Sequence, residues 1–115
     1  MDYGLSKDMP EDDDRQELWK KQREERGFDD TEIWNLDLTL AKFMIPRLKE
    51  YKKSTNGHPL DLTPEEWDEK IDKMIVFFEL IIKDMSEGQV LNSKEQGQYE
   101  EGAGLFFDYF RHLWW

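Results

Sequence analysis

The clearest pattern of apolar and polar positions lies between Leu62 and Met85. Apolar side chains recur there every three or four residues, which is the spacing of one face of an α-helix. Thr63 is suited to cap this helix, Pro64 to begin it, and Glu66 to complete a capping box with Thr63. The apolar face is broad and comprises Trp67, Ile71, Met74, Ile75, Phe78, Ile81, Ile82 and Met85. We therefore expect this segment to be the central helix of a bundle, covered on more than one side.

Two further segments show helical spacing. Between about residues 30 and 53 the apolar positions are Trp34, Leu38, Ala41, Ile45 and Leu48. Between about residues 98 and 113 the apolar face continues to the end of the chain as Tyr99, Ala103, Phe106, Phe107, Phe110, Leu113 and Trp114. Gly102 and Gly104 weaken the last helix intrinsically, but the small size of Gly102, Ala103 and Gly104 would let another backbone approach closely.

The first part of the chain is more polar. Residues 1–10 show no periodicity and are expected to form a frayed arm. Residues 11–26 are helix-prone, with acidic residues first and basic residues last, and Leu18 and Trp19 are their only large apolar side chains. They form either a solvated helix held by those two residues or an arm that becomes ordered on a partner.

These patterns predict an all-α fold, a small helical bundle of three long helices plus an N-terminal helix. The predicted organisation is a charged N-terminal arm or helix at residues 1–26 and a helical bundle domain at residues 27–115. Gly27 marks the boundary, because glycine favours the left-handed conformation that ends a helix.

Composition and charge narrow the possible functions. The chain has 115 residues, 27 acidic against 16 basic side chains, and a formal net charge of −11. Such a surface repels nucleic acids and anionic lipids, so direct nucleic-acid binding is disfavoured. Cysteine is absent, and no apolar stretch is long enough for a membrane span or a secretory signal. A location in the cytoplasm is therefore expected.

Three blocks of the sequence resemble a family of small uncharacterised proteins of tailed phages and prophages. The blocks are GFDDTEIWNLDLTLAKFMIPRLKEYK, HPLDLTPEEWDEKIDKMIVFFE and YEEGAGLFFDYFRHLWW, in this order within residues 27–115. The resemblance implies a phage origin and expression inside a bacterial host. It supplies no catalytic residues.

The sequence offers no constellation of catalytic or metal-binding residues, so we expect neither an enzyme nor a cofactor or metal site. The acidic positions from Asp61 to Asp72 fit a solvated helix face. Neither His58 nor His112 has a ligand at helical spacing that faces a core, and Asp108, four residues before His112, fits an ordinary surface pair. Cations between Lys42 and Lys53 could contact nucleic acid, but they also complement the negative end of a helix dipole.

Two residues are candidates for binding. Asp37 falls within the apolar stripe of its predicted helix, and a buried carboxylate must be paired or hydrogen-bonded. It is expected either to pair with a basic side chain or an indole N–H, or to bind a polar group of a ligand. Trp115 follows the last position of the C-terminal stripe, so its ring could extend an exposed apolar patch.

The sequence therefore favours a non-enzymatic accessory protein that binds a host or phage protein through acidic and aromatic surfaces. Inhibition of a host defence protein and mimicry of DNA are two versions that the negative charge allows. The alternative is a helical bundle that sequesters a small molecule or nucleotide between its helices, with Asp37 as the polar group.

Overall fold

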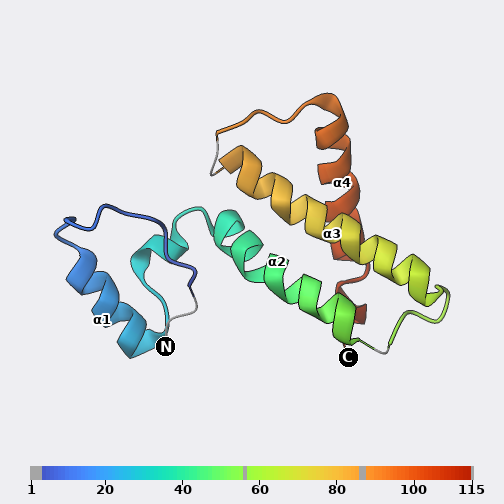
Figure 1. The fold of residues 1–115 in the computed structure, drawn as a ribbon, viewed down its shortest axis with the longest axis horizontal. Coiled ribbons are helices and arrows are strands. Elements are labelled where there is room, and N and C mark those ends of the chain that lie inside the picture. The colour runs from blue at the N-terminus through green and yellow to red at the C-terminus, as the bar shows by residue number, and fades with distance from the viewer. Residues whose placement is uncertain (1–3, 56, 86–87, 115) are drawn as a thin grey trace. The chain divides into compact units, whose positions relative to one another are not determined.

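The computed structural model describes residues 4–55, 57–85 and 88–114. In this part of the chain four α-helices and two short 3₁₀ helices occur and strands do not, so the predicted all-α fold is confirmed (Figure 1). The chain divides into two compact units, residues 1–40 and 41–115. The sequence instead predicts a boundary between residues 26 and 27, with a bundle domain at residues 27–115. That domain boundary stays a prediction.

The first unit contains α1 (Gln16–Arg26) and the 3₁₀ helix η1 (Asp30–Ile33). Gly27 ends α1 in the left-handed conformation, with φ of 85°, and its N–H donates to the carbonyl oxygen of Arg23. Asp29 then caps η1, and the carboxylate of Glu32 accepts from the N–H of Asp29. The end of α1 at Gly27 was predicted from the sequence. Both caps are local, because they depend on residues that are close neighbours in the chain.

The segment before α1 is held in place, and the expectation of a frayed arm is wrong for its described residues. The hydroxyl of Ser6 donates to Oδ2 of Asp29 at 2.6 Å, and the N–H of Lys7 donates to Oγ1 of Thr31 at 2.9 Å. Nζ of Lys7 also donates to Oγ1 of Thr39. These partners are more than 20 residues away in sequence, so local periodicity gave no sign of them.

The predicted helix of residues 30–53 is interrupted. Its first turn is η1, Trp34 is extended, and Asn35 has a positive φ of 51°. The α-helix proper, α2, runs Leu36–Ser54 and includes Pro46. Trp34 therefore packs edge to face on Trp19, with ring centroids 5.9 Å apart, instead of sharing a helical stripe with Leu38.

Asp37 is exposed, which corrects the prediction that it is buried and paired. It lies in the first turn of α2, and its Oδ1 accepts from the N–H of Leu38 at 2.9 Å. The first residue of α2 that belongs to the buried cluster is Ala41, one turn after Asp37. A carboxylate in a first turn is stabilised by the helix dipole and by water, so it needs no buried cation.

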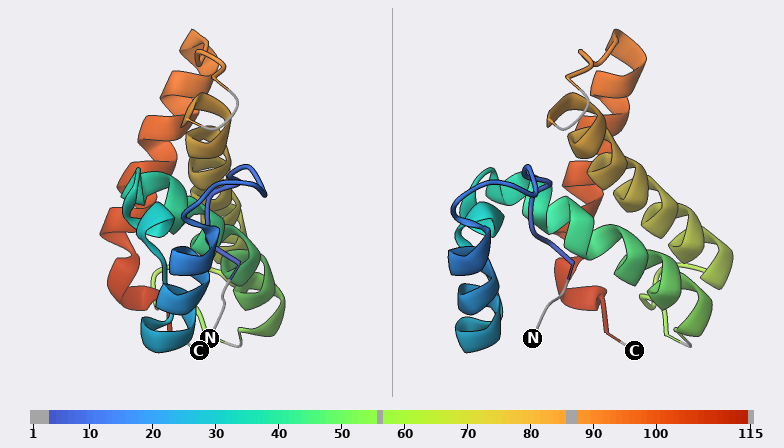
Figure 2. Two further views of the ribbon diagram at one scale, coloured as in Figure 1. Left: turned by 90° about the vertical axis from the view of Figure 1, so that its left-hand side faces the viewer. Right: turned by 60° about the vertical axis from the view of Figure 1, so that its left-hand side comes forward.

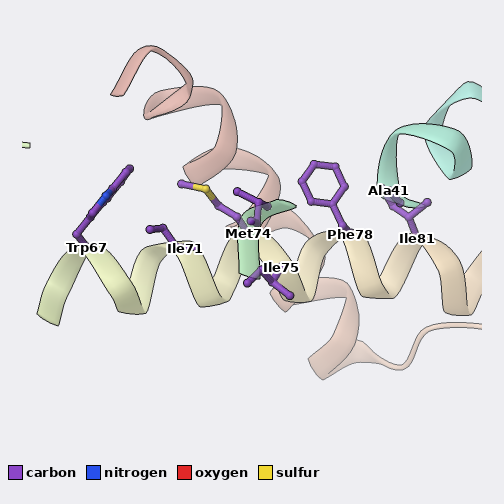
Figure 3. Close-up of a cluster of buried hydrophobic side chains, with 8 residues drawn as sticks. Ala41, Trp67, Ile71, Met74, Ile75, Phe78 and Ile81 are labelled. Carbon is purple, nitrogen blue, oxygen red and sulfur yellow. The ribbon is translucent and has the colours of Figure 1, made fainter. Parts of the chain in front are cut away.

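The second unit is built around α3 (Pro64–Met85), as the sequence predicts. Trp67, Ile71, Met74, Phe78 and Ile81 project from one side of this helix, and Ile75 projects from another (Figure 3). Ala41 and Leu48 of α2 complete the buried cluster. The broad apolar face of α3 is thus covered by more than one helix, which makes α3 the centre of this unit.

The last α-helix, α4 (Ser93–Asp108), begins five residues earlier than predicted. Asn92 caps it, and Glu95 completes a capping box that the polar composition of the preceding segment concealed. The 3₁₀ helix η2 (Phe110–His112) follows. Helix α4 crosses α3 closely in each view (Figure 2).

Gly102 permits the close crossing of α3 and α4, as its small size predicts. A methyl group added at Gly102 would lie 2.4 Å from the carbonyl oxygen of Lys73 and 2.6 Å from Cβ of Phe77. Gly104 has no described heavy atom within 4 Å of such a methyl group, so the same expectation is wrong for this residue. Among the described helices, none is long and apolar enough to cross a membrane.

The capping box of α3 gives a direct test of where this helix starts. The hydroxyl of Thr63 accepts from the N–H of Glu66 at 3.1 Å, and the Glu66 carboxylate accepts from the N–H of Thr63. Thr63→Ala is expected to cost about 1 kcal/mol in urea unfolding, because a first-turn N–H loses its partner. Thr63→Ser keeps the hydroxyl and should leave stability nearly unchanged, and an equal loss in both variants would contradict the assignment.

Candidate functional site

A large hollow in the second unit lies where the loop after α2 meets the C-terminal end of the chain. Its volume is about 960 Å³. Two histidines, two carboxylates, an arginine and a tryptophan are among the residues lining it, which are Gly57, His58, Pro59, Leu60, Asp61, Asp108, Arg111, His112 and Trp114. His58 and His112, which are 54 positions apart in sequence, therefore line one surface.

Tyr51 of α2 holds the C-terminal side of the hollow. Its hydroxyl donates to the carbonyl oxygen of Trp114 at 2.8 Å. The ring of Trp114 lies over the loop, where a methyl group added at Gly57 would be 3.8 Å from Cζ3 of the indole. Trp114 nevertheless remains 63% exposed. The indole is thus positioned by its backbone, and a large part of its ring is available to a binding partner.

The loop side of the hollow is shaped by short-range hydrogen bonds. The N–H of Leu62 donates to the carbonyl oxygen of Pro59 at 3.0 Å, which closes a turn before α3. Nδ1 of His58 lies 3.0 Å from the same carbonyl oxygen, a geometry in which the ring nitrogen donates. Pro59 is buried, and Leu60 at the rim is fully exposed.

The formal charge of the lining residues is slightly negative. Asp61 and Asp108 carry two negative charges against the single positive charge of Arg111, with both histidines neutral. Carboxylates beside an exposed indole can bind a cationic side chain, because the carboxylates pair with the charge and the aromatic face attracts it. The hollow therefore has the chemistry to bind a lysine or arginine of another protein.

An apolar groove adjoins the hollow, since Arg111 lines both. The groove is lined by Phe106, Phe107, Phe110 and Arg111 and has a volume of about 390 Å³. Phe106 packs inward on Phe78, with ring centroids 5.0 Å apart. Phe107 and Phe110 are 85% and 61% exposed. Two large aromatic rings thus face solvent at the end of α4.

The exposure of these rings corrects the predicted C-terminal stripe. The sequence places Phe106, Phe107, Phe110 and Trp114 on one packed face, but only Phe106 packs against α3. The residues of α4 and of the segment after it that adjoin the core follow a stripe shifted toward Leu105, namely Tyr99, Gly102, Leu105, Phe106, Tyr109 and Leu113. A broad apolar arc cannot show by itself how much of its width a neighbouring helix covers.

The two binding residues predicted from the sequence are not brought together. Trp115 lies outside the described residues. Asp37 belongs to the first unit and is not among the residues that line the hollow. Their roles in binding stay predictions. The sequence missed Asp61 and Asp108 as members of one site, and their positions next to a histidine-containing turn and an aromatic helix end were the available signals.

The basic positions of α2 are largely engaged within the second unit. Nζ of Lys52 lies 2.8 Å from Oδ1 of Asp72 on α3, and this hydrogen bond raises the pKa of Lys52. The guanidinium of Arg47 donates to the carbonyl oxygen of Phe43 and lies 3.8 Å from the centroid of its ring. Lys53 pairs with Glu50 at 3.7 Å. These contacts agree with a structural role for the cations between Lys42 and Lys53.

The acidic face of α3 is solvated. Glu65, Glu66, Glu69 and Asp72 are exposed, and Glu66 serves the capping box. Lys73 forms ion pairs with two acids, with Nζ 2.6 Å from Glu101 and 3.7 Å from Glu69. In the part of the chain that the structure describes, groups of three or more potential metal ligands do not occur.

No family model matches this chain, and the comparisons found neither a curated protein nor a solved structure that is similar to it.

Proposed function

We propose that this chain is a phage-encoded, non-enzymatic accessory protein that binds a basic surface of a host or phage protein. The observation that carries the proposal is the hollow in which the carboxylates of Asp61 and Asp108 accompany the exposed indole of Trp114. The resemblance of residues 27–115 to tailed-phage and prophage proteins supports the phage origin and a place of action in the cytoplasm of the bacterial host.

The charge of the whole chain supports a basic partner. A net charge of −11 speeds the encounter with positively charged proteins and opposes contact with DNA phosphates. At the site, the partner's cation would pair with Asp61 and Asp108 and stack on Trp114. Leu60 and Trp114 provide apolar area beside these charges, as the centre of a protein interface requires. Inhibition of a DNA-binding host defence protein is one form of this function, in which the acidic surface replaces DNA.

Neutralising the two carboxylates tests the proposal. The double variant Asp61→Asn with Asp108→Asn should lower capture of the partner from host lysate at least tenfold, and capture by the unaltered protein should weaken as salt rises. The matched control, Glu65→Gln with Asp84→Asn, changes the net charge equally at two exposed acids that do not line the hollow. Equal capture by both double variants would contradict the assignment to the hollow.

The volume of the hollow also favours a second candidate, the sequestering of a small molecule or nucleotide. About 960 Å³ is near the upper end of the usual range for ligand sites, roughly 300–1,000 Å³. In this version Trp114 would stack on a planar ring and Arg111 would pair with an anionic group. A ligand that copurifies with the protein, is identified by mass spectrometry, and disappears in Trp114→Ala would favour this candidate.

A further inference from the structure

Helix α4 carries two stripes of residues with the same spacing, on opposite sides. The inner stripe, which includes Gly102 and Phe106, lies against α3. The outer stripe continues into η2, alternates in steps of three and four, and consists entirely of exposed residues: Gly97, Glu100, Gly104, Phe107 and Arg111. Residues at this spacing share one face of a helix, so they form a surface that a second helix can contact.

The outer stripe exposes an apolar ring and charged side chains to solvent. The ring of Phe107 is 85% exposed and forms part of the apolar groove. Among the described residues, neither Glu100 nor Arg111 has an ion-pair partner. A side chain added at Gly104 would meet no described heavy atom within 4 Å, so its small size serves no packing contact there. Glycine is unfavourable inside a helix, so Gly104 weakens α4 without a packing contact in the described part of the chain that offsets the loss.

The residues of this stripe are complementary to the same residues of a second, antiparallel copy. A two-fold axis that places Phe107 opposite Gly104 of the other copy is centred between Leu105 and Phe106. The pair Glu100 and Arg111 has the same centre along the chain, so this axis brings Glu100 of one copy to the end of the interface where Arg111 of η2 lies in the other copy. Size and charge are therefore both complementary under one symmetry operation, as a two-fold interface requires.

We infer that the outer face of α4 binds a second copy of this chain and forms an antiparallel, two-fold dimer. Phe107 of each copy packs over Gly104 of the other, and two symmetric Glu100–Arg111 ion pairs flank these contacts. The inference goes beyond the proposed function, because Glu100, Gly104 and Phe107 do not line the hollow, and Arg111 is the one residue of the stripe that does.

Exchange of charge tests the dimer. The mass in solution is measured by sedimentation equilibrium at moderate salt, which screens the repulsion between two copies of charge −11. The unaltered protein should have twice the monomer mass. Glu100→Arg places two arginines opposite each other and Arg111→Glu places two glutamates opposite each other, so each variant alone should be monomeric. A one-to-one mixture of the two variants restores both ion pairs and should regain the dimer.

A third variant separates association from folding. Gly104→Gln puts a good helix former on the exposed face, so circular dichroism should show helicity that is unchanged or higher. Its side chain occupies the space of the opposing Phe107, so the dimer should dissociate at least tenfold more readily. A monomeric unaltered protein, an assembly larger than a dimer, or a mixture that stays monomeric would each overturn the inference. Partner capture through Asp61 and Asp108 is measured separately and can succeed or fail independently.

Discussion

Asp29→Ala is expected to destabilise the unit formed by residues 1–40 by roughly 3 kcal/mol. The carboxylate of Asp29 is fully buried and lies 2.6 Å from the guanidinium of Arg23. It also accepts from the hydroxyl of Ser6 and from both the N–H and the hydroxyl of Thr31. Removing it leaves several donors without an acceptor. The expected loss of unfolding free energy is at the lower end of the range for a broken buried ion pair, because the side chain of Arg23 is 20% exposed.

The measurement is urea unfolding followed by the fluorescence of Trp19, which is buried in this unit. Asp30→Ala is the matched control, because Asp30 is the adjacent carboxylate and pairs with Arg26 at a more exposed position. The control should lose clearly less stability. Equal losses would contradict the central role of Asp29.

The same group makes the first unit sensitive to acid. Burial acts to raise the pKa of Asp29, but hydrogen bonds from Ser6, Thr31 and Arg23 outweigh it, so the pKa lies below its ordinary value of 3.8. Because the folded form has the lower pKa, its stabilisation is present above the ordinary value and is lost as pH falls through the folded value. The Trp19 signal of Asp29→Ala should therefore show a weaker acid transition than that of the unaltered protein.

Gly102→Ala is expected to destabilise the second unit by about 2 kcal/mol or more, in the upper part of the range for overpacking. The added methyl group would lie 2.4 Å from the carbonyl oxygen of Lys73. A backbone atom cannot move aside as a flexible side chain can, so α3 and α4 must separate. Separation weakens the packing of Phe106 on Phe78 and of Tyr109 on Trp67.

The control for Gly102→Ala is Gly97→Ala on the same helix. A methyl group at Gly97 has no described heavy atom within 4 Å, and Gly97 takes part in neither the Phe107–Gly104 nor the Glu100–Arg111 contacts of the inferred dimer. This variant should therefore gain up to about 1 kcal/mol from helix propensity. Thermal unfolding by circular dichroism measures both variants. Changes of the same sign would show that α3 and α4 do not approach closely at Gly102.

The sequence by itself determined the elements whose signals are local. The start of α3 at Pro64, the end of α1 at Gly27 and the cap of η1 at Asp29 depend on residues within four positions of one another. The core face of α3 could also be predicted, because its apolar side chains are too numerous to remain in water. The all-α fold follows from these signals and from the absence of strand-like alternation.

Only the tertiary structure decided which faces are covered and which distant residues meet. Periodicity shows that Asp37 shares a helix face with Ala41. It does not show that Ala41 is buried and Asp37 exposed. Phe106 and Phe107 are equally apolar, yet α3 covers only the first. Burial depends on neighbours contributed by other parts of the chain, and hydrogen bonds such as Ser6 to Asp29 join residues 23 positions apart. The meeting of His58, Asp61 and Trp114 in one hollow has the same origin, because the path of the chain in space brings them together.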